Sequence, residues 1–470
     1  MKHAREPRTC DSIAGWSMSE RTCRIVTFGC KANQYDTQVV REALLDAGFR
    51  EVGAAESADL CVVNTCTVTH QADSDGRYAI RRLSRENPGA RIVVMGCYAS
   101  RDPQTLRNIP GVVAVVDHPD RVGDVLRPFG VRRLPNGISK FAGHHRAFVK
   151  VQDGCLLNCT FCIIPQVRPS LRSRPPEEIE QEVRRLVRTG FHEIVLTGIH
   201  LGHYGVEYSR GRPRREWCRL SHLIRRLVRI PGDWRLRLSS LEATEVTDEL
   251  IDVVAGEGRV CPHLHLCLQS GSDTVLRAMK RRYRGAGFLR RVDQIRRRLD
   301  RPALTTDVIV GFPGETERDF LQTLRVCEQA GFSKIHIFPF SPRSGTPAAT
   351  MPGQLDPETV RDRKTRLAAL ESELAARYYQ CLVGCSLQVL VEGVSQTDPQ
   401  ESTGTACRYV PVRFNARPTE EGELISLRVV ETTGSSLRGE REPCGSEPTH
   451  FGFPVLPILN RFPYNQSSDQ

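Results

Sequence analysis

Three cysteines stand close together in the segment Cys155-Leu-Leu-Asn-Cys159-Thr-Phe-Cys162, directly after the apolar run AFVKVQDG. Iron–sulfur clusters are held by thiolates, and three thiolates can hold three irons of a cubane while the fourth iron stays open to a ligand. Zinc is the alternative, but a closed zinc site needs four ligands, and neither a second such motif nor a histidine nearby in the sequence supplies the fourth. The spacing therefore favours an iron–sulfur cluster.

A second set of three cysteines is spread over the first hundred residues. Cys30 follows the apolar run RIVTFG, Cys66 follows ADLCVVNT, and Cys97 follows RIVVMG. Successive parallel strands end at one edge of their sheet, which is where such sheets bind ligands. Three thiols at that edge could hold a second cluster with an open iron. The alternative is chance placement of buried thiols, which is how we interpret Cys61 inside its strand.

The elements that must position these thiols begin with an extension over residues 1–22. Residues 23–127 alternate short β-branched runs with helical periodicity, including helices over Val39–Ala47 and Tyr78–Leu83. This alternation predicts a flavodoxin-like parallel sheet with helices on both faces. Residues 128–145 have no sustained period and are interpreted as a linker.

Residues 146–380 repeat the α/β alternation in larger units. Six strands are predicted in AFVKV, EIVLTG, RLRLSS, HLHLCL, TTDVIVGFPGE and KIHIFPFS, with helices between them and a closing helix over residues 357–380. Six such units fit a partial TIM-like (β/α)6 barrel, in which ligands bind at the carboxyl ends of the strands.

The remainder of the chain changes to short strands. SLQVLVEG, YVPVRF and LISLRVVE predict a small all-β barrel over residues 381–433, and residues 434–470 are expected to be a loosely ordered tail. Tyr409 and Phe414 lie on YVPVRF at an odd spacing. A regular strand would therefore turn one of the two rings outward, where it could stack on a nucleic-acid base.

The residues around both cysteine sets resemble those of a known enzyme family. The spacing CxxxCxxC ahead of a barrel-like chain is similar to that of the radical S-adenosylmethionine (SAM) superfamily. TFGCKANQYD, NTCTVT and MGCYA resemble the amino-terminal domain of the methylthiotransferases, and with GFPGET and a TRAM-like β module the resemblance runs from Cys23 to Glu431. Within that family, GCKxNQY, NTCTVT and GCYA resemble the branch that acts on N6-threonylcarbamoyladenosine at tRNA position 37.

The resemblance implies a tRNA-modifying transferase that uses SAM and two [4Fe–4S] clusters. Cys155, Cys159 and Cys162 would hold the cluster that cleaves SAM to a 5′-deoxyadenosyl radical, and this radical would abstract hydrogen from the base. A second SAM would supply the methyl group of the methylthio product at C2. The sulfur would be carried on the open iron of an auxiliary cluster held by the other set, Cys30, Cys66 and Cys97.

SAM would contact the cluster loop and the ends of the barrel strands. The candidates are the aromatic residue of the loop and five residues in or after apolar runs: Phe161, Gly198, Ser240, Glu242, Gln269 and Asp307. Ordinary turn chemistry is the alternative for the small and polar ones. Hydrogen abstraction needs no general acid or base, so we expect no catalytic role for any of the 13 histidines.

The partners implied are tRNA and a reducing electron donor such as flavodoxin or ferredoxin, while the sulfur donor stays open. A different methylthiotransferase substrate, either isopentenyladenosine in tRNA or a ribosomal protein, is one alternative. Another radical SAM methyltransferase is a second, and a non-enzymatic metal-binding RNA protein is the distant third. The second cysteine set argues for sulfur insertion, and the β module argues for RNA.

Two positions depart from the family pattern. Pro169 follows Arg168 where the family usually has glycine, and because proline fixes φ, we expect this loop to take another path. Asp75-Gly76 precedes Arg77 where the branch usually has a Lys-Ser pair, which removes a positive charge that could contact tRNA.

Composition limits the location and the partners. No run of 18 apolar residues occurs, so no membrane-spanning helix is expected. The first twenty residues lack the apolar segment of a signal peptide, which predicts a cytoplasmic location with the 17 cysteines reduced. The net charge of +11 permits an anionic partner, and we expect Arg281, Arg282 and Arg284 to supply part of the salt-dependent tRNA binding.

Overall fold

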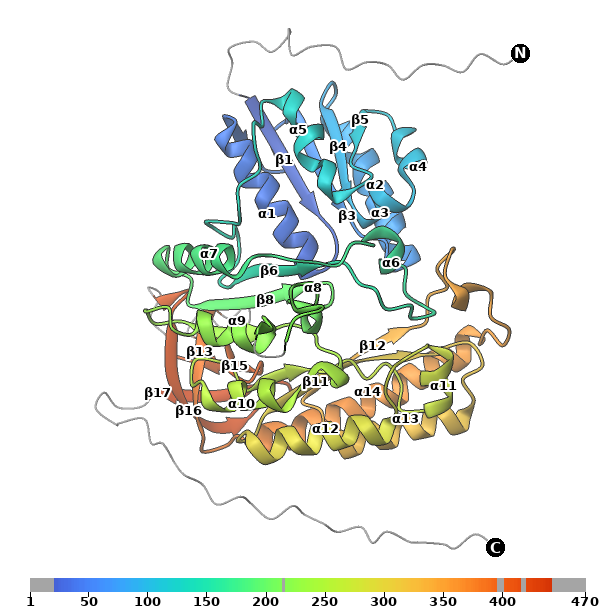
Figure 1. Ribbon diagram of the computed structural model, residues 1–470, viewed down its shortest axis with the longest axis vertical. Helices are drawn as coiled ribbons and strands as arrows, with labels where there is room; N and C mark the ends of the chain where they lie inside the picture. Colours follow the sequence, from blue (N-terminus) through green and yellow to red (C-terminus); the bar gives the residue numbers. More distant parts are fainter. Residues whose placement is uncertain (1–20, 214–215, 395–400, 416–419, 442–470) are drawn as a thin grey trace, which may run out of the picture.

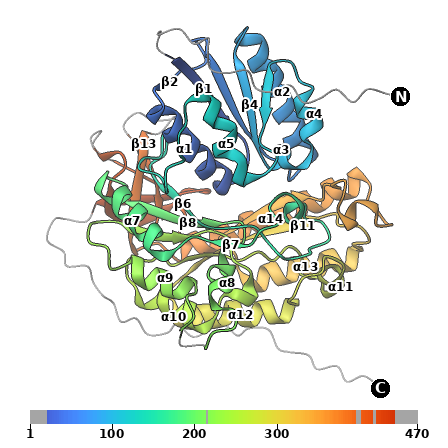
Figure 2. The ribbon, with the colours of Figure 1, turned by 45° about the horizontal axis from the view of Figure 1, so that its top comes forward.

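The computed structural model describes residues 21–213, 216–394, 401–415 and 420–441. A parallel-sheet domain lies above an open barrel, and a small β-barrel lies beside the start of the open barrel's strands (Figures 1 and 2). The predicted α/β fold class with these three parts is confirmed. Residues 1–20 of the expected extension and residues 442–470 of the expected tail lie outside the described residues.

The amino-terminal domain is built on a parallel sheet. Its strands are β1 (Arg21–Thr27), β2 (Phe49–Glu51), β3 (Leu60–Thr65), β4 (Arg91–Gly96) and β5 (Val112–Val115), in the spatial order β2-β1-β3-β4-β5. Its helices are α1 (Lys31–Asp46), α2 (His70–Glu86), α3 (Cys97–Arg101), α4 (Pro103–Arg107) and α5 (Val122–Leu126). Separate apolar clusters pack on the two faces of the sheet, as predicted for a parallel sheet. The short strand β2 is an addition to the prediction.

The central part is an open barrel. Its strands are β6 (Ala147–Asp153), β7 (Arg172–Ser173), β8 (Glu193–Gly198), β9 (Arg235–Leu238), β10 (His263–His265), β11 (Ala303–Val310) and β12 (Lys334–Pro339). Its helices are α6 (Ile164–Val167), α7 (Pro176–Arg188), α8 (Val206–Ser209), α9 (Leu220–Leu227), α10 (Asp248–Gly256), α11 (Asp273–Ala278), α12 (Gly285–Arg298), α13 (Glu317–Ala330) and α14 (Pro357–Gln380). The six predicted strands and the closing helix over residues 357–380 are all present.

The pairing of these strands leaves the barrel open on one side. Parallel ladders join β6, β8 and β9, and others join β10, β11 and β12. Isolated parallel bridges, Leu236 to Val260 and Leu241 to Leu266, connect the two groups. Within the described residues β6 and β12 do not pair with each other. The first turns of α1 pack against β6, so the amino-terminal domain sits on the barrel beside the opening (Figure 1).

The carboxyl-terminal module is a closed five-stranded barrel. Its strands are β13 (Ser386–Val394), β14 (Ser402–Ala406), β15 (Pro411–Phe414), β16 (Leu424–Thr432) and β17 (Leu437–Arg441). β17 pairs with both β15 and β16 and thereby closes the barrel. This strand falls in the range expected to be a tail, so the module extends past residue 433 to Arg441.

The expectation that Tyr409 or Phe414 presents a ring to RNA is wrong. The strand begins only at Pro411, and Tyr409 has a positive φ of 59°, so the chain turns there. Phe414 is buried in the core of the module. The Tyr409 ring stacks on His263 of β10, with centroids 4.8 Å apart. Both aromatic side chains therefore serve packing.

A buried ion cluster attaches the module to the barrel. Glu193 on β8 pairs with Arg235 and Arg237 on β9, at 2.6 and 2.8 Å respectively. The same guanidinium groups donate to carbonyl oxygens of the module, those of Gln388, Thr405, Ala406 and Cys407. Because Glu193 and Arg235 are the first residues of β8 and β9, the module closes the amino-terminal end of the barrel.

Replacing Glu193 with alanine should destabilise the protein by about 3–5 kcal/mol, because two buried guanidinium groups lose their carboxylate. Burial alone would raise the pKa of Glu193, but the two arginines hold it well below its ordinary value. A lowered folded-state pKa contributes stability above the unfolded pKa of about 4.3, so the difference from wild type should shrink as the pH falls below that value.

Thermal unfolding at several pH values measures this effect. Glu177→Ala is the matched control, because Glu177 pairs with Arg226 at the surface, where an ion pair contributes about 1 kcal/mol or less. Equal unfolding midpoints for the two variants at neutral pH would contradict the role given to Glu193.

Candidate active site

The first cysteine set lies on a loop between β6 and α6. Thr160, in the middle of the loop, donates its backbone N–H to the Met279 carbonyl at 3.2 Å and its hydroxyl to the Ala278 carbonyl at 2.8 Å. Its own carbonyl accepts the N–H of Ala348 at 2.9 Å. These bonds anchor the loop to the end of α11 and to the segment after β12, which fixes where the three thiols stand.

The spacing of the thiols argues against a single metal ion. Ligands of one tetrahedral zinc ion lie about 3.8 Å from each other, given Zn–S bonds of about 2.3 Å. Among the described residues, neither cysteine set brings all three sulfurs within 4.8 Å of one another. Thiolates that bind three separate irons of a cubane stand farther apart than the ligands of one ion. Three thiolates are a donor set that holds an iron–sulfur cluster, and a single zinc ion would need them closer together.

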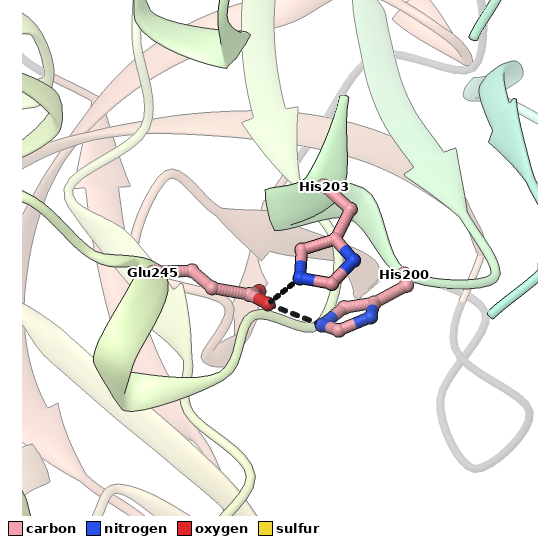
Figure 3. Close-up of side chains that lie close together, drawn as sticks. All are labelled: His200, His203 and Glu245. Atoms are coloured by element: carbon pink, nitrogen blue, oxygen red, sulfur yellow. Dashed lines mark ion pairs between the residues drawn. The ribbon is translucent and has the colours of Figure 1, made fainter. Parts of the chain in front are cut away.

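Two histidines and a glutamate adjoin the first set, although no role was expected for any histidine. His200 Nδ1 lies 3.5 Å from the Sγ atom of Cys155. Its Nε2 atom forms an ion pair with Glu245, which also pairs with His203 Nε2 at 3.1 Å (Figure 3). Burial alone would raise the pKa of Glu245, but the two histidines lower it to about 2. The segment TGIHLGH at the end of β8 could have indicated these histidines, since strand ends of such barrels face the ligand site.

Arg281 also belongs to this site. It donates to the Sγ atom of Cys159 at 3.4 Å and pairs with Glu242 at 3.1 Å. Its side chain is only 7% exposed, so the expectation that it binds tRNA phosphates is wrong. Two cysteines of the first set thus have a potential hydrogen-bond donor, Arg281 or His200, beside their sulfur atoms.

The predicted SAM-contact residues have diverse surroundings. Glu242 is linked to the cysteine loop through Arg281. Phe161 packs with an apolar cluster, and Ser240 is exposed. A Cβ atom on Gly198 would come within 2.9 Å of the Gln152 side chain, so close packing is one reason for this glycine. Their contact with SAM stays a prediction.

Two further candidates are Gln269, which follows β10, and Asp307, which lies on β11. Gln269 has a positive φ of 62° and bridges to Val308 of β11. Asp307 lies inside β11 and not at its end, where its carboxylate meets His265 at 3.3 Å. Asp307 therefore faces the interior of the barrel below the strand ends.

The second cysteine set is brought together by the sheet of the amino-terminal domain. Cys30, Cys66 and Cys97 each follow the carboxyl end of a strand, β1, β3 and β4. A Cβ atom on Gly29, which has a positive φ of 102°, would lie 3.2 Å from the Cys66 sulfur. One on Gly96 would lie 2.2 Å from the Asn64 side chain. Glycine at both positions therefore lets the loops approach closely, and the predicted convergence of the strand ends is present.

Burial raises the pKa of thiols in both sets. The pKa of Cys66 rises to about 11 and that of Cys162 to about 12. The pKa of Cys97 also rises through burial, although Arg168 partly opposes this. Iron binds thiolates, so loading either site must displace protons.

Arg168 joins the two sites. Its guanidinium donates to the Cys97 sulfur at 3.5 Å and to the Asn33 side chain at 3.0 Å in the amino-terminal domain. It also pairs with Asp36 at 2.8 Å and with Asp153 at 2.7 Å, the latter at the end of β6. Lys150 pairs with the same two carboxylates, so two cations and two anions form one network between the domains. This network is buried or half-buried.

The two departures from the family pattern have local consequences. The carbonyl oxygen of Ser170, just after Pro169, lies 2.0 Å from where a Cβ atom on Gly154 would stand, so the loop packs on the residue before Cys155. Arg77 donates to the Tyr98 hydroxyl at 2.8 Å and is thus engaged inside its own domain.

Comparison with known proteins agrees with this arrangement. Residues 22–117 match the uncharacterized protein family UPF0004, and residues 149–327 match the radical SAM superfamily. A threonylcarbamoyladenosine tRNA methylthiotransferase of Bacillus subtilis, MtaB, is 37% identical over 86% of this chain and 93% of its own length. The chain belongs to the radical SAM methylthiotransferase family. It is a transferase, and its family cofactors are SAM and [4Fe–4S] clusters.

Other relatives in this family differ in their named substrate. A tRNA-2-methylthio-N(6)-dimethylallyladenosine synthase of Corynebacterium urealyticum is 38% identical over 88% of this methylthiotransferase and 81% of its own length. Among solved structures, the methyltransferase TsrM of Kitasatospora setae has a TM-score of 0.52 at 16% identity, covering 70% of this chain and 77% of that one. This likeness concerns the fold alone. None of the described helices of this methylthiotransferase combines the length and apolarity that crossing a bilayer requires.

Replacing Arg168 with methionine should weaken the docking of the two domains by about 3–5 kcal/mol, because two carboxylates would share Lys150 alone. Thermal unfolding and the rate of proteolytic cleavage in residues 128–145 measure the effect. Arg172→Met is the control, since Arg172 pairs with Asp120 at the surface and its loss should cost about 1 kcal/mol or less. Unchanged unfolding and cleavage in Arg168→Met would refute the linking role.

Proposed function

We propose that this chain transfers a methylthio group to C2 of N6-threonylcarbamoyladenosine at position 37 of tRNA, by radical SAM chemistry with two [4Fe–4S] clusters. The observation that carries the proposal is that one buried arginine, Arg168, joins two cysteine sets from different domains. Sequence identity alone does not select the base, because relatives with either named substrate are 37% and 38% identical. The choice of base rests on the motifs GCKxNQY, NTCTVT and GCYA.

Each cysteine set has its own task in this proposal. Cys155, Cys159 and Cys162 would hold one cluster, and Cys30, Cys66 and Cys97 the other. When bound, the first cluster with SAM supplies a radical that removes hydrogen from the base, and the second supplies the sulfur. His200 and Arg281 lie against thiols of the first set, and Arg168 lies against Cys97 of the second. Such outer contacts orient ligands and tune a metal centre.

A basic hollow offers a contact for the tRNA backbone. It has a volume of about 790 Å³ and lies at the start of α12. Phosphate contacts by arginine supply much of the affinity for nucleic acids. Arg281 closes the inner side of the hollow, and the remaining arginines are those that could face phosphates: Arg282, Arg284, Arg290 and Arg291.

The proposal implies further partners and a reducing environment. SAM cleavage consumes an electron, so a one-electron donor such as flavodoxin or ferredoxin must supply it. Sulfur insertion consumes a sulfur atom, whose donor the sequence leaves open. The thiols must be free to bind iron, which suits a cytoplasmic location with reduced cysteines.

Two triple variants should separate the two clusters. Replacing Cys155, Cys159 and Cys162 with alanine should abolish SAM cleavage and leave about half of the iron. Replacing Cys30, Cys66 and Cys97 should preserve SAM cleavage and stop methylthio transfer. Iron analysis, 5′-deoxyadenosine release and nucleoside mass spectrometry measure these outcomes. Cys327→Ala, a buried cysteine outside both sets, serves as the control. Multiple-turnover product from the second triple variant would disprove the two-cluster proposal.

Substrate choice tests the proposed base directly. The reconstituted wild-type enzyme should convert tRNA that carries N6-threonylcarbamoyladenosine and should leave tRNA with isopentenyladenosine unchanged. Nucleoside mass spectrometry of both tRNAs after incubation with SAM and a reductant gives the answer. Equal conversion of the two, or conversion of the isopentenyl form alone, would overturn the assignment of the base.

A further inference from the structure

The interior of the open barrel is lined by polar side chains. Asp307 of β11 and His336 of β12 are register partners, and His265 of β10 lies beside them. Ligand atoms of these three residues lie within 4.8 Å of one another. The alternate residues of the same strands, such as Leu264 and Val308, are buried in the apolar core under the helices. Because side chains alternate along a strand, the three polar residues face the interior.

Lys31 reaches toward this interior from the other domain. It is the first residue of α1 and directly follows Cys30. Its ammonium group lies 5.9 Å from the centre of the Phe148 ring on β6. Along β6, Phe148 and Lys150 point to one face and Val149 to the other. Lys150 pairs with Asp36 of α1, so α1 packs on the face that carries Phe148.

The charge of Lys31 contributes to the pKa shifts of two polar residues of the barrel interior. Burial alone would raise the pKa of Asp307. The hydrogen bond from His265 lowers this pKa, and the charge of Lys31 contributes in the same direction, so that the net shift is downward. Burial lowers the pKa of His336, and the charge of Lys31 acts in the same direction. These contributions agree with the position of the Lys31 ammonium group 5.9 Å from the centre of the Phe148 ring, on the face of β6 where α1 packs.

Lys31 has no carboxylate partner among the described residues. Within the described part of the chain, its ammonium makes neither a hydrogen bond nor an ion pair within 4.0 Å, whereas Asp307 is held by His265. Four cations near the two cysteine sets, in contrast, each have a carboxylate partner: Lys150, Arg168, Arg281 and Arg343. Three donors of Lys31 are thus available to a ligand that lies between the second cysteine set and the barrel.

We infer that Lys31 is a specificity-determining residue that binds a carboxylate carried on the N6 substituent of the substrate base. This inference rests on the proposed function, since the threonylcarbamoyl group ends in a carboxylate and the dimethylallyl group is uncharged. A charge-assisted hydrogen bond favours the anionic substituent. With an uncharged substituent the ammonium would lose water without gaining a partner, so the site rejects it.

The test compares two forms of the same tRNA with the holoenzyme: one with the free threonyl carboxylate and one with that carboxylate methyl-esterified. Affinity without turnover and kcat/KM are both measured, and iron content is checked for each variant. Wild type should prefer the free acid by about ten- to a hundredfold, the range for a hydrogen bond to a charged group. Lys31→Met should lose this preference, and Lys31→Arg should keep most of it.

Lys140→Met controls for the general loss of one positive charge, because Lys140 is an exposed residue of the linker. It should keep the wild-type preference for the free acid. Retention of that preference by Lys31→Met, in affinity, would overturn the inference while the proposed function stands. If wild type converts only the isopentenyl tRNA, the proposed function fails and the inference fails with it. Loss of the preference in Lys140→Met as well would also count against a specific role for Lys31.

Discussion

The buried network of Arg168, Lys150, Asp36 and Asp153 is the interaction on which the geometry of the site depends. Two cations balance two anions, so no member is left as an uncompensated charge in the interior. Asp153 stands two residues before Cys155, and Asp36 stands six residues after Cys30. Arg168 also touches the Cys97 sulfur. A shift of one domain against the other would break several of these contacts together, which fixes the separation of the two cysteine sets.

Backbone constraints make this network possible. In both sheets the cysteines follow strand ends, where parallel pairing brings distant segments together. Gly29 and Gly96 hold positive φ values and leave no room for a Cβ atom beside Cys66 and Asn64. Asn33 then donates to the carbonyls of Phe28 and Thr65, tying the ends of β1 and β3. Local conformation and long-range pairing therefore position the same three thiols.

The strands and the two cysteine sets could be predicted from the sequence, because both depend on local patterns of residues. Strands β3, β4 and β8 each contain an uninterrupted apolar run, and the cysteines of both sets stand at or shortly after strand ends, so the sequence identified both sets as candidates. Two kinds of long-range contact were not predicted: the Arg168 network across the domains and the approach of His200 to Cys155 inside the barrel. Neither has a fixed sequence spacing. The prediction for Tyr409 was wrong for a related reason: its positive φ places it in a turn before β15, and its partner, His263, lies in another domain.

The charged side chains inside the barrel differ from one end of the strands to the other. At the amino-terminal end, Arg235 and Arg237 are neutralised by Glu193 and by carbonyl oxygens of the small barrel, so that end is closed and satisfied. At the middle level Asp307 is held by His265. Toward the second cysteine set, Lys31 makes no ion pair with a described carboxylate, and its ammonium group lies 5.9 Å from the centre of the Phe148 ring. Under the proposed function, in which the reacting atom lies between the two cysteine sets, this charge faces the substituent of the base, so that charge as well as shape would select the base.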